Sequence, residues 1–161
     1  MKKIISIIGL VFMFFLIEFL IFNLAGRSFM PNFMILFIIF VSLSLGIRYS
    51  IFTAVIAGVV KDSFGVGVFG IHSFSFIVCA YLTILFKKYV YHVTSFSSRL
   101  LLVFIIVVSN VVIQFFLKFM FGSVSVRDAL RHVLLPEVVM TLIVANFTFE
   151  RLKACASRLF A

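Results

Sequence analysis

Charged residues are scarce in this chain: aspartate, glutamate, lysine and arginine make up 12% of its 161 residues, and only five of these are acids. Hydrophobic residues make up 65%, and the mean hydropathy is +1.34. This composition excludes a soluble globular domain and a protein with a single membrane anchor. The chain is predicted to be one all-α integral membrane domain over residues 1–161.

Cysteine is also rare, and the motifs of metal and catalytic sites are missing. Cys79 lies in an apolar run and Cys155 in a basic tail, so no disulfide or metal site is predicted. The three histidines, His72, His92 and His132, belong to separate segments, and no H-x-x-H, H-E-x-x-H or paired-carboxylate spacing appears. We therefore predict no enzyme activity, no cofactor and no metal.

Acids are outnumbered by bases, which gives a formal net charge of +9. In a soluble protein this excess would suggest a nucleic acid partner. Here the cations lie between apolar runs, so they are interpreted as topology determinants that face anionic membrane lipid, and no nucleic acid partner is predicted.

One glycine-rich stretch imitates a nucleotide-binding motif. Gly65, Gly67 and Gly70 read G-x-G-x-x-G, a spacing that indicates a dinucleotide site only when a strand precedes it and an acid lies about 20 residues further on. An apolar helical run precedes it instead, and Lys87 and Lys88 occupy the later positions. The stretch is interpreted as a turn between two membrane helices.

The apolar residues gather in runs that predict a six-transmembrane-helix bundle. Most of the runs reach roughly 22–28 Å at about 1.5 Å per residue, close to the ~30 Å hydrocarbon thickness. The third is the shortest, and it either crosses with help from its polar flanks or enters and returns. The first is interpreted as a retained signal anchor, because no small-x-small cleavage site follows it. The predicted spans are residues 4–22, 33–47, 50–62, 71–86, 100–117 and 133–149.

A five-span alternative fuses the second and third runs into one helix with Arg48 buried midway. Six spans from a cytoplasmic N-terminus place nine cations inside and five outside, whereas five spans place six inside and seven outside. The positive-inside rule and the cost of burying Arg48 favour six spans, with both termini in the cytoplasm.

Several residues are candidates for helix junctions and helix packing. Pro31 is predicted to open the second helix, a position where its missing N–H costs nothing. Within the third run Ser50, Ala54 and Gly58 form a small-xxx-small ridge that allows another helix to approach closely. In the fifth run Asn110 and Gln114 lie one turn apart and are interpreted as interhelical hydrogen-bonding groups.

Four of the five acids fall on or near the outer side in this topology. They lie at the level of several lysines and arginines, so acids and bases are expected to pair around an outward-facing polar recess. Either the pairing serves only the structure or the recess has a function, and the sequence leaves both open. The predicted recess residues are Glu18, Lys118 and Glu137, with Asp62 beside them.

The stretch Gly58-Val59-Val60-Lys61-Asp62 resembles the Gly-Leu-x-x-Asp signature of the rod shape-determining MreD family. The later Gly70 in Val68-Phe69-Gly70, the Tyr81-Leu82 pair, Pro31 and Gly46 also match that family, and the resemblance covers nearly the whole chain. Val59 replaces the usual leucine, and Val68 stands where many members have proline.

This resemblance implies a component of the bacterial inner membrane that takes part in cell elongation. Members pair with the bitopic protein MreC and help to connect MreB filaments to peptidoglycan synthesis by RodA and a class B penicillin-binding protein. The resemblance thus implies a non-enzymatic scaffold, and we expect the small-residue ridge and the polar recess to dock a helix of the partner.

The family is also similar in fold to the S components of energy-coupling-factor transporters. The alternative function is therefore a subunit that binds a small molecule, such as a vitamin. Against it, S components usually present alanine-rich helices to their coupling subunit, and this chain has no Ala-x-x-x-Ala segment.

Overall fold

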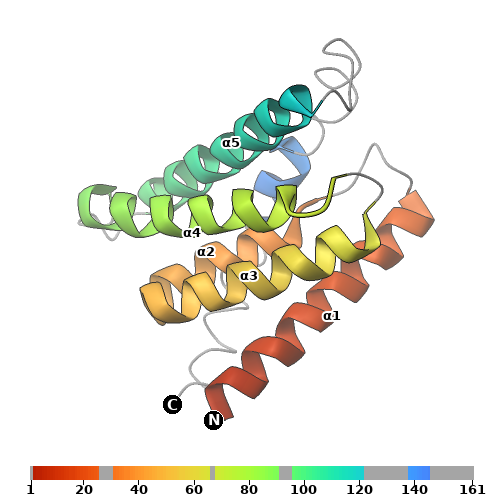
Figure 1. Cartoon of the computed structure of the whole chain (residues 1–161). Coiled ribbons are helices and arrows are strands. Elements are labelled where there is room, and N and C mark those ends of the chain that lie inside the picture. Colours follow the sequence, from red (N-terminus) through yellow and green to blue (C-terminus); the bar gives the residue numbers. More distant parts are fainter. Residues whose placement is uncertain (1, 26–30, 66–67, 91–95, 122–137, 146–161) are drawn as a thin grey trace.

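The computed structural model describes residues 2–25, 31–65, 68–90, 96–121 and 138–145. Every regular element in these ranges is a helix, which confirms the predicted all-α class. The helices are α1 (Lys2–Ala25), α2 (Phe33–Ser44), α3 (Ile47–Phe64), α4 (Ile71–Val90) and α5 (Phe96–Met120), followed by a helical segment over residues 138–145 (Figure 1).

Three of the helices are long and apolar enough to cross a membrane, over Lys3–Leu24, Ile71–Tyr89 and Leu100–Met120. Large apolar side chains also cover much of their outer surfaces; Leu16 of α1 is 55% exposed and Phe116 of α5 is 60% exposed. Such surfaces are stable against lipid rather than water. The chain is therefore a membrane protein built as a helical bundle.

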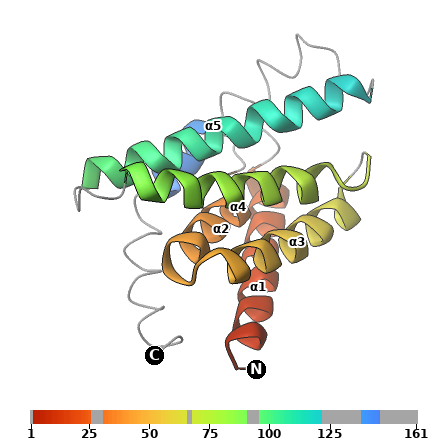
Figure 2. The ribbon, with the colours of Figure 1, turned by 60° about the vertical axis from the view of Figure 1, so that its left-hand side comes forward.

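The shortest of the five labelled helices, α2, lies at the centre of the bundle. It packs against α1, α3, α4 and α5, and both ribbon views place it beneath α4 and beside α3 (Figures 1 and 2). Every residue from Met34 to Ser42 is buried. An all-round apolar helix is what such a position requires, since no face of it meets water.

The junction between α2 and α3 is a glycine. Gly46 has a φ of 86°, in the left-handed region that side chains avoid, and the chain turns there between the two helices. Arg48 follows in the first turn of α3 and is exposed. The break excludes the fused helix of the five-span alternative.

The helix lengths differ from those predicted for the second and third runs. α2 ends at Ser44 instead of residue 47, and α3 runs over Ile47–Phe64, so α2 is about 18 Å long and α3 about 27 Å. Apolar composition alone underestimated α3, because its first and last turns carry polar residues that are nevertheless helical. Of these two helices, the shorter one, α2, is the more deeply buried.

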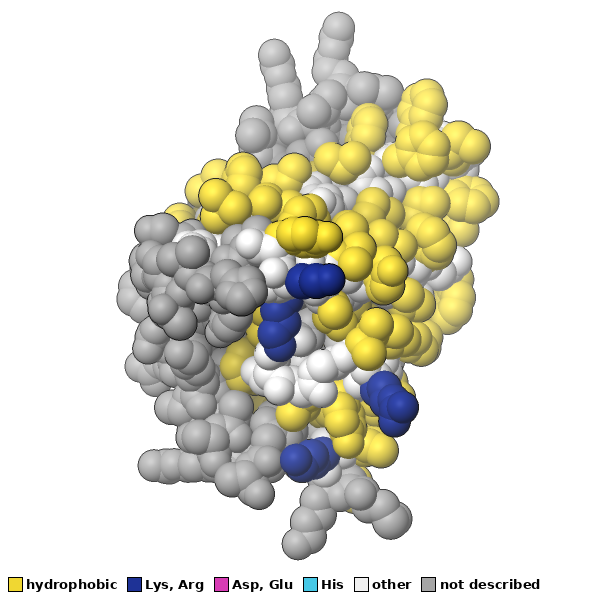
Figure 3. All heavy atoms as spheres, turned by 90° about the vertical axis from the view of Figure 1, so that its left-hand side faces the viewer, with side chains coloured by type: hydrophobic (Ala, Val, Ile, Leu, Met, Phe, Trp, Pro, Cys, Tyr) yellow, Lys and Arg dark blue, Asp and Glu magenta, His cyan; other side chains and the backbone are white. Residues whose placement is uncertain are grey.

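The two ends of the bundle differ in charge. Lys87 of α4 donates to the carbonyl oxygen of Leu43 at 2.7 Å, so a cation caps the C-terminal end of α2. Exposed Lys88 and Arg48 lie at the same end. Figure 3 views this end and shows lysine and arginine side chains among apolar ones, with no acid visible among the described residues. The described acids lie at the other end.

Candidate functional site

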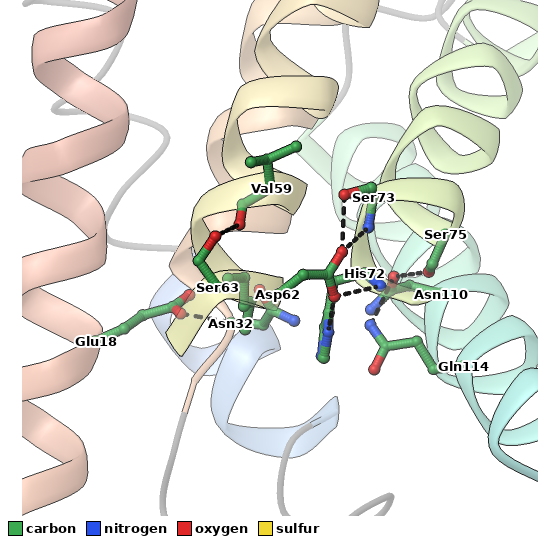
Figure 4. A network of polar contacts seen from close by, with 11 residues as sticks. Glu18, Asn32, Val59, Asp62, Ser63, His72, Ser73, Ser75, Asn110 and Gln114 are labelled. Atoms are coloured by element: carbon green, nitrogen blue, oxygen red, sulfur yellow. Dashed lines mark hydrogen bonds and ion pairs between the residues drawn. The ribbon is translucent and has the colours of Figure 1, made fainter. Parts of the chain in front are cut away.

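Polar side chains gather at the end where α3 stops and α2 and α4 start (Figure 4). They come from the three helices α1, α3 and α4, from the residue before α2 and from the segment 138–145, and all are buried or half-buried. We call this group the polar cluster; its members are Glu18, Asn32, Lys61, Asp62, His72, Ser73 and Thr141.

Lys61 is the centre of one half of the cluster. Its Nζ lies 3.0 Å from Oε2 of Glu18 and donates to Oδ1 of Asn32 at 3.1 Å. The same ammonium lies 5.8 Å from the centroid of the Phe76 ring, within cation–π range. Glu18 is 1% exposed and Lys61 is half-buried, and their ion pair ties α1 to α3 at this end.

Glu18 and Asn32 also cap the start of α2. The backbone N–H of Met34 donates to Oε1 of Glu18 at 2.9 Å, and that of Ile35 donates to Oδ1 of Asn32 at 3.2 Å. The N–H of Asn32 itself donates to the hydroxyl of Thr141 at 3.0 Å. The first N–H groups of a helix lack partners within it, and water does not reach them here, so these side chains supply the acceptors.

Asp62 accepts hydrogen bonds from the first backbone N–H groups of α4 and so caps the start of that helix. Its Oδ1 accepts from the backbone N–H of His72 at 3.0 Å and lies 2.8 Å from Nδ1 of the same residue. Its Oδ2 accepts from the N–H and the hydroxyl of Ser73 at 3.0 and 2.7 Å. A carboxylate at a helix N-terminus is stabilised by the helix dipole, and both of its oxygens are occupied.

Gly58 brings α3 and α4 close enough for these bonds. A Cβ atom at this position would lie 2.3 Å from Cα of Ser73 and 2.7 Å from its backbone N. Real Cβ atoms do not approach backbone so closely, so only glycine fits. The glycine and the acid of the family signature therefore act together: Gly58 permits the approach, and Asp62, one turn further on, bonds to the helix end that has approached.

The small-residue ridge is covered by the chain's own helices, which corrects the expectation that it docks a partner's helix. Ser50, Ala54 and Gly58 are all buried. Gly58 faces α4, and the hydroxyl of Ser50 shares a hydrogen bond with that of Ser42 in α2. Small side chains allow helices to pack closely, but here the neighbours lie within the same chain.

The predicted open recess is also corrected for Glu18, which is enclosed in its ion pair instead of lining an accessible hollow. Lys118, in the last turn of α5, is half-buried and lies close enough to His72 for their charges to interact. Glu137 lies outside the described residues. The pairing of acid with base is found, since Glu18 contacts Lys61.

Two predicted junction residues have different roles. Pro31 does not open α2 as expected, because Asn32 is the N-cap and α2 begins at Phe33. Gly70 has a φ of 100°, a conformation that favours glycine, and its carbonyl oxygen accepts from the N–H of Phe74 at 2.9 Å. It turns the chain into α4, so the glycine-rich stretch leads from one helix to another.

Sequence reasoning missed Asn32, Ser73 and Thr141 as members of the cluster. The signal for Asn32 was available, because asparagine directly before an apolar run is a typical N-cap. Ser73 and Thr141 carried no such signal, since each meets a residue distant in the sequence.

The arrangement ties the helices of the bundle together. Within the described part of the chain, no three His, Cys, Asp or Glu residues converge in a way that could hold a metal ion. Lys61 and Asp62 are engaged with several partners each, and the hydroxyl of Ser73 and Nδ1 of His72 both lie within hydrogen-bond distance of the Asp62 carboxylate.

A comparison with known protein families matches residues 1–150 to the family described as rod shape-determining protein MreD. The chain belongs to the MreD family. No curated protein and no solved structure matches it. MreD proteins are rod shape-determining membrane proteins, in agreement with the apolar helices of this chain, and the family is not known for enzyme activity.

Proposed function

We propose that this MreD-family protein is a non-enzymatic scaffold of the cell-elongation machinery in the bacterial inner membrane. It binds a bitopic protein of the MreC type and links MreB filaments to the peptidoglycan synthases, RodA and a class B penicillin-binding protein. The observation that carries the proposal is the family match over residues 1–150.

The internal contacts support a rigid scaffold. Lys61 ties α3 to α1 and to the start of α2, and Asp62 ties α3 to α4. At the other end, Lys87 ties α4 to α2. Because these links join buried polar groups in a bundle surrounded by lipid, opening any of them would leave a charge or a dipole unpaired. A bundle fixed in this way can hold partners in a constant geometry.

The charge difference between the two ends supports an orientation. The end with Arg48, Lys87 and Lys88 faces the cytoplasm, together with the chain termini, and the polar cluster faces outward. The cytoplasmic face would then present cations to MreB or to anionic lipid, and partner contacts would be made outside the covered ridge.

Co-purification from membranes in which the cell's own MreD has been depleted tests the proposal. The tagged chain should restore rod shape and should retain the MreC-type protein through detergent extraction. Round cells that contain normal amounts of the inserted chain, with no MreC-type protein retained, would contradict it. A vitamin carried through purification, with uptake that depends on an ATPase module, would favour the S-component alternative instead.

A further inference from the structure

The contact between α4 and α5 contains buried polar side chains that belong to neither the polar cluster nor the capped helix ends. Oδ1 of Asn110 accepts from the hydroxyl of Ser75 at 2.5 Å and from Nε2 of Gln114 at 3.2 Å. The thiol of Cys79 lies 4.0 Å from the same oxygen. Ser75 and Asn110 are fully buried, and Gln114 is 7% exposed. We call these four residues the α4–α5 seam.

The other half of the Asn110 amide is unpaired. Its Nδ2 is buried and has no hydrogen-bond partner among the residues that the structure describes. An unsatisfied buried donor destabilises the folded state, and native structures contain few of them. We therefore expect Nδ2 of Asn110 to have a hydrogen-bond partner.

Exchanging the assigned positions of the amide oxygen and nitrogen of Asn110 still leaves one of its polar atoms without a partner. With Asn110 alone reversed, its Nδ2 would face Nε2 of Gln114, so two donors would meet. With both amides reversed, Asn110 and Gln114 would bond again, but the unpaired position would hold a carbonyl oxygen. One polar position of Asn110 stays open in every arrangement.

We propose that the α4–α5 seam binds a structural water molecule at the open position of Asn110. Water is the ligand that fits the chemistry, because it accepts from an amide nitrogen and donates to a carbonyl oxygen equally well. Buried waters in proteins typically make about three hydrogen bonds to groups of this kind. The neighbouring polar groups of the seam are the hydroxyl of Ser75 and the side-chain amide of Gln114, which both bond to Oδ1 of Asn110.

Polar side chains along α5 connect the end of the bundle with the position proposed for the water. Asn110, Gln114 and Lys118 follow one another at intervals of four residues along α5, and exposure rises from buried Asn110 to half-buried Lys118. On α4, His72 and Ser75 lie near the start of the helix, at the end of the bundle that holds the polar cluster. The seam thus leads from the polar cluster toward the middle of α5.

Radiolytic hydroxyl-radical footprinting of the full-length protein in nanodiscs tests this proposal. Radicals formed from a bound water modify the side chains beside it, even where bulk water does not reach. Cys79 is the reporter, since it is fully buried and lies beside Asn110. Phe37 is the control, because it is equally buried but lies in the apolar core around α2.

Each modification rate is divided by the intrinsic reactivity of its side chain. A bound water predicts that Cys79 is modified several-fold faster than Phe37, and that Asn110→Leu reduces the rate at Cys79 to the level of Phe37. Equal protection of Cys79 and Phe37 in the unaltered protein would overturn the proposal, whether or not the variant folds. A stoichiometric adduct of higher mass in native mass spectrometry would assign the site to a solute and also overturn it.

Discussion

Substituting Gly58 by alanine tests how the family signature works. The added Cβ would lie 2.3 Å from Cα of Ser73, and reaching ordinary contact requires α3 and α4 to separate by about 1 Å. That separation also stretches the hydrogen bonds from Ser73 to Asp62, at 2.7 and 3.0 Å. Overpacking of this kind costs about 1–3 kcal/mol, which lowers the melting midpoint by about 2–12 °C in a protein of this size.

Cys79 offers a direct assay for this prediction, because its thiol is fully buried. In a Cys155→Ser background, a thiol-reactive dye reports unfolding of the detergent-solubilised protein as Cys79 becomes accessible. Gly9→Ala is the matched control: no heavy atom lies within 4 Å of its added Cβ, and alanine should stabilise α1 by about 0.5–1 kcal/mol. A Gly58→Ala protein that melts at or above the midpoint of the unaltered protein would refute the close-approach argument.

Further substitutions can be read with the same dye assay. Lys61→Met leaves Glu18 charged and buried without its cation, so we expect a loss of about 3–5 kcal/mol, and adding Glu18→Leu should recover part of it; no recovery would contradict a pairwise role. Asp62→Asn removes one acceptor oxygen from the start of α4, and a drop in the midpoint is expected, whereas an unchanged midpoint would mean that the capping bonds contribute little. Gly46→Ala places a side chain at a φ of 86° and should cost about 1–2 kcal/mol, and a neutral effect would argue against a strained turn.

The sequence carried enough information for the class of fold and for the order of the helices. Apolar runs separated by glycine, proline and charge predict membrane helices, because lipid leaves few alternatives to a helix for the backbone. Gly46 and Gly70 interrupt these runs, and both have positive φ in the structure. The predicted topology also indicated that Glu18 pairs with a base at its own level in the membrane, and in the structure that base is Lys61.

Which helix face meets which neighbour was not predictable from the spacing of small residues. Ser50, Ala54 and Gly58 indicate a close approach equally well for a partner's helix and for α4, and only the three-dimensional arrangement decides between them. The predicted third span, residues 50–62, was too short by three residues at its start and two at its end, because polar Arg48 and Ser63 interrupt the apolar run and yet lie within the helix.

The central claim is that the bundle crosses the membrane with the polar cluster outside and the cationic end inside. Exposed Ser63 and Arg48 test it on one helix, since fifteen residues of α3 separate them by about 22 Å. In a background of Cys79→Ala and Cys155→Ser, a membrane-impermeant maleimide is applied to protoplasts before and after lysis. The account predicts that Ser63→Cys is labelled in intact protoplasts and Arg48→Cys only after lysis, whereas labelling of both positions from the same side would contradict it.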